Sequence, residues 1–285
     1  MTTQPFSRVA IINRGEPAVR FLRALDEFNL IHNTSIKGIA LYTEPDEHMP
    51  FVRQADEAVC IGGILRPQEN GKVLNAYCDH DWIIEMLHKH QCDAVWPGWG
   101  FVSEDPIFVQ QLEQHNIVFL GPSSDAMSQL GDKIAAKYLA EKAGVPLAPW
   151  SEYKAEWTLE ELLAEGERIG YPLMVKASAG GGGRGIRKVK QPENLQKTIE
   201  TVQSEVEKFF GQGGILLERC VSNARHIEVQ LVCTSTKAHA VGIRDCSIQR
   251  KNQKVIEEAP SPILPEDIGS LLMESSENLA QLCNY

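Results

Sequence analysis

Residues 171–190, YPLMVKASAGGGGRGIRKVK, are the stretch of sequence that decides the fold. The apolar run Tyr171–Ser178 predicts a strand, and Ile186–Lys190 predicts a second strand that returns beside it. The glycines between them fit the pattern G-x-G-x-x-G, but a dinucleotide fold needs a helix after that pattern, and a P-loop needs a lysine where Ile186 stands. The stretch therefore predicts a hairpin flap whose glycine N–H groups can close on phosphate oxygens. A flexible surface loop is the alternative.

Before the flap, short apolar runs alternate with helical patterns. Helices are predicted after Pro17 and over Asn75–His90 and Asp105–Asn116. Strands are predicted at Arg8–Asn13, Ile36–Thr43, Glu57–Ile61, Asp93–Trp96 and Ile117–Leu120. Because parallel strands need helical crossovers, this order predicts an α/β fold with a doubly wound parallel sheet.

The remainder of the chain predicts a different architecture. Ser123–Gly144 is helical, as one long helix or two short ones, and stops before Pro146. The flap strands, the strand Ile215–Arg219 and helices over Leu159–Ile169 and Pro192–Phe209 form a small α+β unit. Strands then follow at His226–Cys233, at Ala238–Arg244 and around 254–257, with a last helix over Glu266–Cys283. The absence of a capping signal at Tyr285 suggests that the sequence ends inside a domain.

Length and composition exclude several classes of protein. The 285 residues predict about two domains. A net charge of −10, from 28 Lys and Arg against 38 Asp and Glu, argues against nucleic-acid or anionic-membrane partners. No apolar run reaches the ~18 residues of a membrane span, and the N-terminus lacks the apolar core of a signal peptide. Seven cysteines without a C-x-x-C pair indicate a reducing compartment. We therefore expect a cytoplasmic protein.

Three polar residues stand out near the flap. Lys176 lies in an apolar strand, so it either needs an anionic partner or occupies the exposed face of an edge. Lys133 lies on a predicted helix, where a lysine is usually solvated. Glu218 ends a strand, and backbone groups at such a position can pair with the edge of a nucleobase. A simple junction between strand and turn is the alternative.

Two further segments carry charge in an alternating or dense pattern. The period of a strand places His226, Glu228 and Gln230 on one face, which is either solvent-exposed or the floor of an active site. Residues 250–254, RKNQK, hold three cations in an acidic protein. They can bind phosphate or bicarbonate, or they form an ordinary solvated surface.

The order of these segments resembles the biotin carboxylase family of the ATP-grasp superfamily. The segments are GDK (131–133), YPLMVKAS, the glycine loop, LLER (216–219), RHIEVQ (225–230) and RDCSIQRKNQKVIEEAP (244–260). VAIINRGEPAVR (9–20), ADEAVCIG (55–62), WPGWGFVSEDP (96–106) and FLGPS (119–123) extend the resemblance to the first third. The segment WPGWG looks more like single-chain acetyl-CoA carboxylases than like free-standing bacterial biotin carboxylases.

The resemblance implies a domain organisation and a reaction. It places an N-terminal biotin carboxylase domain at 1–121, a helical linker at 122–147, an ATP-grasp lid subdomain at 148–220 and the start of an incomplete ATP-grasp C subdomain at 221–285. In the family, ATP phosphorylates bicarbonate to carboxyphosphate, which breaks down to CO2 that carboxylates biotin. The implied partners are a biotinyl carrier domain and a carboxyltransferase of the acyl-CoA type, with a homodimer as a further expectation.

The resemblance also assigns residues. Lys133 and Lys176 hold the ATP phosphates, and Gly182 and Gly183 lie in the lid loop over them. Lys254 is the catalytic residue that binds bicarbonate. The remaining nucleotide contacts are Glu218, Arg219, Cys220, Val221, His226 and Asn252. Asn252 stands where the family has a histidine, and Ala179 replaces a loop glycine, so we expect altered affinity and a slightly stiffer flap.

The family's two magnesium-binding glutamates, its catalytic arginine and its biotin-contacting arginine correspond to positions after Tyr285. We therefore expect no metal ligands in this chain and no turnover by the chain alone. Two alternatives are a catalytically inactive nucleotide-binding module and another ATP-grasp ligase of the carbamoyl-phosphate-synthase kind. The segment RDCSIQRKNQK argues against the second.

Overall fold

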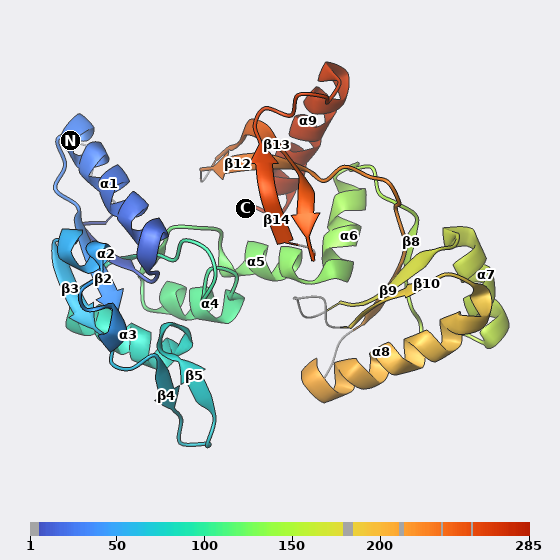
Figure 1. Ribbon diagram of the computed structural model, residues 1–285, viewed down its shortest axis with the longest axis horizontal. Coiled ribbons are helices and arrows are strands. Elements are labelled where there is room, and N and C mark those ends of the chain that lie inside the picture. Colours follow the sequence, from blue (N-terminus) through green and yellow to red (C-terminus); the bar gives the residue numbers. More distant parts are fainter. Residues whose placement is uncertain (1–5, 179–184, 211–213, 235, 252) are drawn as a thin grey trace. The chain divides into compact units, whose positions relative to one another are not determined.

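The computed structural model describes residues 6–178, 185–210, 214–234, 236–251 and 253–285 (Figure 1). The chain divides into two compact units, Met1–Met127 and Ser128–Tyr285. No helix in the described part of the chain is long and apolar enough to cross a membrane.

The first unit is built on a parallel sheet with the strand order β3-β2-β1-β6-β7. Its strands are β1 (Arg8–Ile11), β2 (Lys37–Tyr42), β3 (Glu57–Cys60), β6 (Ala94–Trp96) and β7 (Val118–Phe119). Every neighbouring pair is parallel. The predicted α/β class is therefore confirmed.

Helices cover both faces of this sheet. Val9 and Ile11 of β1 pack on the side of α1 (Gly15–His32), and α2 (Pro50–Gln54) lies on that side too. Ala10 and Ile12 pack with α3 (His80–Lys89) and α4 (Pro106–Gln114). Because both faces are buried, β1 reads as a continuous apolar run, and the sheet is doubly wound as predicted.

Between β3 and α3 the structure differs from the prediction. A short hairpin of β4 (Leu65–Pro67) and β5 (Val73–Asn75), which the sequence did not suggest, lies in this segment. The helix expected over Asn75–His90 is a single turn, η2 (Ala76–Cys78), followed by α3. Asp79 separates them because its carboxylate accepts a hydrogen bond from the amide of Trp82 and so caps α3. Another single turn, η1 (Glu44–Asp46), follows β2.

The sequence left open whether the segment Ser123–Gly144 forms one long helix or two short ones, and the structure has two. They are α5 (Ser124–Gly131) and α6 (Lys133–Lys142). Asp132 separates them and caps α6, since its side chain accepts from the amides of Ile134 and Ala135 at 2.9 and 2.8 Å. This cap fixes Lys133 at the first position of α6.

An antiparallel sheet with the order β10-β9-β11-β8 contains the flap strands. Its members are β8 (Trp150–Glu152), β9 (Leu173–Ala177), β10 (Ile186–Val189) and β11 (Ile215–Arg219). The predicted hairpin is confirmed, because β10 returns beside β9 with Ile186 opposite Lys176. The glycine loop 179–184 lies outside the described residues.

One face of this sheet is apolar and covered by helices. Leu173, Val175 and Ala177 of β9 pack in a core with α7 (Leu159–Ile169) and α8 (Leu195–Phe210), which follows the single turn η3 (Pro192–Asn194). Figure 1 shows both helices beside this sheet. The alternation of β9 therefore turns Met174 and Lys176 to the opposite face, which we call the inner face.

The last part of the chain is a three-stranded antiparallel sheet, β12-β13-β14, with one helix. Its elements are β12 (Ile227–Cys233), β13 (Ala238–Arg250), β14 (Gln253–Glu258) and α9 (Glu266–Leu282). β13 continues six residues past the predicted strand Ala238–Arg244, through mostly polar side chains. Glu277 of α9 accepts the amide of Ala240 at 2.8 Å, which ties the helix to β13.

Candidate functional site

A cluster of charged side chains lies on the inner face of the flap sheet. Lys176 of β9 donates to Glu218 Oε2 of β11 at 2.5 Å, and Lys137 of α6 donates to Glu218 Oε1. Lys133 starts the same helix one turn earlier, and its Nζ donates to the carbonyl of Ser178 at 3.2 Å. Three elements, α6, β9 and β11, therefore bring these side chains together.

The charged side chains of this cluster are largely buried, so water screens their interactions only weakly. The side chains of Lys137, Lys176 and Glu218 are 17%, 24% and 14% exposed. Burial alone would raise the pKa of Glu218, but the hydrogen bonds from Lys137 and Lys176 outweigh it and hold that pKa below its ordinary value. Glu218 is therefore a carboxylate at neutral pH.

Lys133 and Lys176 are close enough to repel each other. Burial lowers the pKa of Lys133; the charge of Asp132 opposes that effect, and the charge of Lys176 adds to it. An anion placed between two such ammonium groups would relieve both the repulsion and the loss of solvation. The arrangement is therefore suited to holding phosphate oxygens.

The end of β11 holds the other residues predicted to border a nucleobase. The amides of Arg219 and Cys220 donate to the carbonyls of Pro149 and Pro172 at 2.8 and 2.9 Å. The Val221 side chain, by contrast, is 63% exposed. The strand end is thus fixed by internal hydrogen bonds, and Val221 offers an apolar surface beside it.

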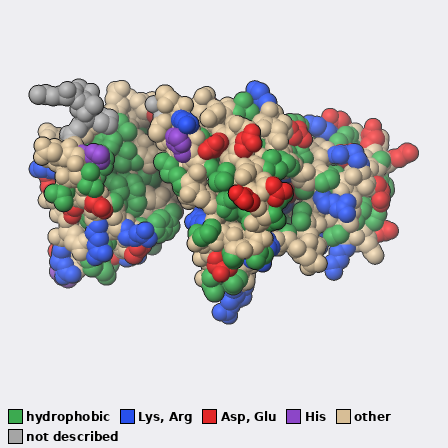
Figure 2. Space-filling model, turned by 90° about the horizontal axis from the view of Figure 1, so that it is seen from above, with side chains coloured by type: hydrophobic (Ala, Val, Ile, Leu, Met, Phe, Trp, Pro, Cys, Tyr) green, Lys and Arg blue, Asp and Glu red, His purple; other side chains and the backbone are tan. Residues whose placement is uncertain are grey.

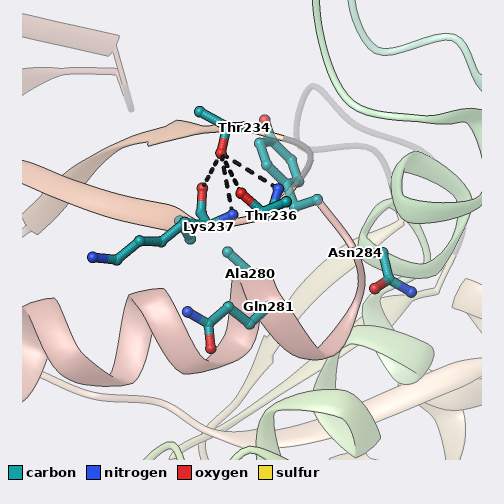
Figure 3. Close-up of a pocket in the computed structure, with 8 residues that line it drawn as sticks. Thr234, Thr236, Lys237, Ala280, Gln281 and Asn284 are labelled. Carbon is teal, nitrogen blue, oxygen red and sulfur yellow. Dashed lines mark hydrogen bonds between the residues drawn. The ribbon is translucent and has the colours of Figure 1, made fainter.

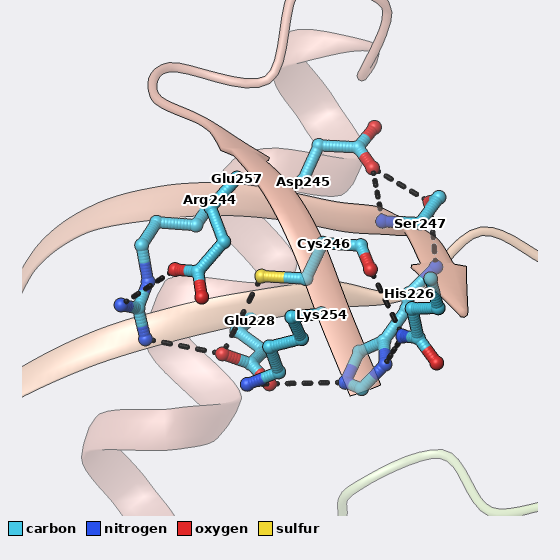
Figure 4. Close-up of polar contacts among 9 residues, drawn as sticks. His226, Glu228, Arg244, Asp245, Cys246, Ser247, Lys254 and Glu257 are labelled. Carbon is cyan, nitrogen blue, oxygen red and sulfur yellow. Dashed lines mark hydrogen bonds and ion pairs between the residues drawn. The ribbon is translucent and has the colours of Figure 1, made fainter. Parts of the chain in front are cut away.

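A second polar cluster lies on the β12-β13-β14 sheet and is centred on Glu228 (Figure 4). Its Oε1 accepts from Lys254 and, at 3.0 Å, from His226 Nε2. Its Oε2 accepts from Arg244 at 3.0 Å and from the thiol of Cys246 at 3.6 Å. Arg244 also contacts Glu257 at 3.2 Å. Lys254 and His226, which the resemblance names separately, thus share one carboxylate.

The hydrogen bonds of this cluster define its protonation. The hydrogen bond from Lys254 lowers the pKa of Glu228 against the opposing effect of burial, and the same bond raises the pKa of Lys254. Gln249 Nε2 lies 2.7 Å from His226 Nδ1. When that amide donates, Nδ1 is an acceptor, and the ring proton on Nε2 goes to Glu228.

A buried carboxylate braces the start of β12. Asp245 is 3% exposed and accepts from Arg225, from the amide of Ser247 and, at 2.6 Å, from the Ser247 hydroxyl. Ser247 in turn accepts the amide of His226 at 2.9 Å. The hydroxyl of Ser247 is the main reason why the pKa of Asp245 falls to about 2, with Arg225 contributing against burial. The brace fixes the backbone that carries His226.

Some predicted residues do not join either cluster. Gln230, expected on the same face as Glu228, lies at a bulge between Gln230 and Leu231, and its amide donates to the carbonyl of Leu231. Gly182, Gly183 and Asn252 lie outside the described residues. Within the described ranges, no group of three or more His, Cys, Asp or Glu side chains could hold a metal ion.

The sequence reasoning missed several members of the two clusters. Lys137 had a usable signal, because it lies four residues after Lys133 and so shares its helix face. Arg244 had a weaker one, since it stands directly opposite Glu228 in the register of β12 and β13. Nothing in the sequence predicts the link between Asp245 and Arg225, twenty residues earlier.

Two surface features lie apart from these clusters. A cavity of about 320 Å³ lies beside the β12–β13 turn and the end of α9, and its lining includes Thr234, Lys237 and Asn284 but none of the predicted residues (Figure 3). On the face in view in Figure 2, acidic and basic side chains are interspersed and not gathered by sign.

Comparison with known families matches both parts of the chain. Residues 132–285 match the family described as carbamoyl-phosphate synthase L chain, ATP binding domain. Residues 5–127 match the family described as biotin carboxylase, N-terminal domain.

Individual relatives agree with these matches. A urea amidolyase of Saccharomyces cerevisiae is 41% identical over 98% of this chain and 14% of its own length. A biotin carboxylase of Nostoc is 40% identical over 98% of this chain and 60% of its own length. The solved biotin carboxylase domain of the Hydrogenobacter thermophilus 2-oxoglutarate carboxylase, a dimer with MgADP, ADP and bicarbonate, superposes with a TM-score of 0.83 at 35% identity. That match covers 99% of this chain and 59% of that one.

The parallel sheet, the flap sheet and the final antiparallel sheet are those of an N-terminal biotin carboxylase domain followed by an ATP-grasp ATP-binding domain. The chain belongs to the biotin carboxylase family. It spans 50–60% of the length of the biotin carboxylases that it matches.

Proposed function

We propose that the chain binds ATP and bicarbonate as the front part of a biotin carboxylase, an ATP-dependent ligase within a longer biotin-dependent carboxylase. The observation that carries the proposal is that Lys133 of α6 reaches the carbonyl of Ser178, the residue that follows β9, while Lys176 lies on the inner face of that strand. Phosphoryl transfer asks the protein chiefly for positioned cations, because charge spreads over the phosphate oxygens during the reaction.

Within this proposal, Lys133 and Lys176 hold the ATP phosphates, and the loop with Gly182 and Gly183 closes over them. The end of β11, at Glu218, Arg219, Cys220 and Val221, borders the adenine. The fixed backbone of this strand end and the exposed Val221 side chain support that role. His226 and Asn252 complete the nucleotide contacts.

Lys254 is the proposed bicarbonate-binding residue. Its ammonium carries three N–H donors, and Glu228 accepts one of them. Its raised pKa keeps it charged through neutral pH. An anion can therefore share Lys254 with Glu228, and the neighbouring guanidinium of Arg244 adds positive charge to the same surface.

The remaining assignments rest on the family and not on contacts described here. They include the domain boundaries at 121, 147 and 220, a cytoplasmic location, a biotinyl carrier domain, a carboxyltransferase and a homodimer. Magnesium would neutralise phosphate charge, and the family resemblance places its ligands after position 285. We also keep as proposals that turnover needs residues placed after position 285 in the family, and that the acceptor is an acyl-CoA, as WPGWG (96–100) suggests.

Nucleotide binding by the purified chain tests the proposal. Isothermal titration with ATP is compared for the wild type, Lys176→Met and Lys142→Met. Lys142 is an exposed lysine at the end of α6, so the control makes the same change of charge. We expect Lys176→Met to weaken ATP binding at least about tenfold, the value of one charge-assisted hydrogen bond, with no effect of the control. Failure of the wild type to bind ATP would refute the proposal.

The reaction itself is tested in the longer native protein. ADP release that requires both bicarbonate and biotin, and that is lost in Lys254→Met, is the expected result. Release stimulated by ammonia and indifferent to biotin would instead support a ligase of the carbamoyl-phosphate-synthase kind. Transfer of labelled bicarbonate to acyl-CoA, pyruvate or urea identifies the acceptor.

A further inference from the structure

Glu218 presents a problem for phosphate binding at this site. Lys176 Nζ lies 2.5 Å from Glu218 Oε2, so any anion that Lys176 holds also lies close to this carboxylate. A carboxylate with little solvent around it, at 14% exposure, repels a nearby polyphosphate more strongly than an exposed one does. Something must offset that repulsion if Lys176 is to serve the nucleotide.

Lys137 is placed to do so. It reaches Glu218 from α6, on the side of Oε1, while Lys176 reaches it from β9 on the side of Oε2. Its own side chain is 17% exposed, so the pair is shielded from bulk solvent on both sides. The helix that carries it also carries Lys133, four residues earlier on the same helical face.

Resting on the proposed function, we propose that Lys137 is a positioning residue for the nucleotide phosphates and acts through Glu218 on Lys176. With Lys137 in place, Glu218 keeps a cationic partner on Oε1 when Lys176 turns one or more of its N–H donors to phosphate. Without Lys137, Glu218 depends on Lys176 alone, holds it more tightly and repels the phosphates.

The relation between the two residues gives the proposal a signature that plain structural damage does not have. In Lys137→Met, Glu218 is left with an unbalanced charge, and ATP affinity falls. In Glu218→Gln that charge is absent, so Lys137 has nothing to neutralise. The double variant Lys137→Met/Glu218→Gln is therefore expected to bind ATP better than Lys137→Met alone.

The experiment measures ATP and adenosine affinities of the whole chain by competition with a fluorescent ATP analogue. We expect Lys137→Met to bind ATP about tenfold more weakly, the size of one charge-assisted hydrogen bond, and Lys137→Arg to bind it as the wild type does. Adenosine, which lacks phosphates, is expected to bind Lys137→Met and Lys137→Arg as it binds the wild type. Because Glu218 borders the adenine in the proposed function, Glu218→Gln and the double variant are compared only with each other. Lys142→Met again controls for loss of one charge on α6, and circular dichroism confirms that each variant folds.

The outcomes separate this inference from the proposed function. If the wild type does not bind ATP, both are overturned. If it does, and Lys137→Met equals it or loses adenosine to the same degree as ATP, only the role of Lys137 is overturned. Should Lys137→Met fail to fold, the comparison of Glu218→Gln with the double variant decides. Equal ATP affinities there support the proposal, and a further tenfold loss in the double variant contradicts it.

Discussion

Replacing Glu228 by glutamine is expected to destabilise the β12-β13-β14 sheet in a way that depends on pH. The substitution keeps the shape of the side chain and removes its charge. In the native protein the carboxylate accepts from Lys254, Arg244 and His226. A glutamine amide can accept on one atom only, and its NH2 group points a donor at other donors.

The magnitude follows from how much water reaches the partners. The side chains of Lys254 and Arg244 are 36% and 38% exposed, so solvent screens both ion pairs. Pairs of that kind contribute roughly 0.5–1 kcal/mol each. Losing both predicts a loss of about 1–2 kcal/mol at neutral pH, and each kcal/mol lowers Tm by about 2–4 °C for a domain of this size.

The sign of the pH dependence comes from the direction of the shift. Glu228 has a folded-state pKa below its ordinary value of 4.5, chiefly because Lys254 donates to it and despite the opposing effect of burial. A carboxyl shifted in this direction stabilises the fold fully above its unfolded pKa, and the contribution is lost as pH falls through the folded value. The wild type should therefore exceed Glu228→Gln in stability at pH 8, and the difference should shrink below about pH 4.

Urea denaturation of both proteins at pH 8 and at about pH 3, below the ordinary pKa of a glutamate, measures this difference directly. Glu258→Gln is the matched control, because Glu258 lies exposed on β14 and has no ion pair within the part of the chain that the structure describes. The control should stay within about 0.5 kcal/mol of the wild type. Equal losses at both pH values would mean that Glu228 acts through shape alone, and no loss at pH 8 would contradict the ion pairs.

Three other substitutions test the fold by equilibrium denaturation. Gly98→Ala places a Cβ 2.6 Å from Asn13 Nδ2 at a φ of +61°. It should lower the free energy of unfolding clearly more than Gly100→Ala, which should cost ~1–2 kcal/mol because φ is also positive there but nothing lies within 4 Å. Equal losses would contradict the clash. Asp132→Ala removes the cap of α6 and should lower the free energy of unfolding by about 1 kcal/mol. An unchanged urea midpoint would show that the cap does not stabilise the protein. Phe108→Ala empties a fully buried site and should cost about 3–5 kcal/mol; a loss below 1 kcal/mol would refute the packing of α4.

The parts of the fold that could be predicted are those with a strong period or a clear break. The flap hairpin followed from the apolar run of β9 and from glycines that no helix follows. The hairpin of β4 and β5 could not be predicted in the same way, because its strands are three residues long and several of its apolar side chains are exposed. β13 was predicted too short because its second half is mostly polar and lies against the exposed strand β14.

The candidate site also has residues that could be predicted from the sequence and contacts that could not. Lys176 and Glu218 could be singled out because a charge in an apolar strand needs a reason. Their contact could not be foreseen, since it depends on β9 and β11 pairing antiparallel so that two residues 42 positions apart share the inner face. Glu228 was noted only as one of three polar residues on a strand, and its role as the centre of a cluster depends on Arg244 and Lys254 from two other strands.

The two clusters differ in the charge interactions that an anion meets when it binds. Around Glu228, acidic and basic groups alternate from Glu257 through Arg244 to Glu228 and Lys254, so each charge already has an opposite neighbour. An anion there must share a cation with a carboxylate. Lys176 is shared with Glu218 in the same way, but Lys133 and Lys176 also repel each other, so an anion between them removes a repulsion. This repulsion predicts that phosphate binds between Lys133 and Lys176 more readily than bicarbonate binds Lys254, where another group must first displace or neutralise Glu228.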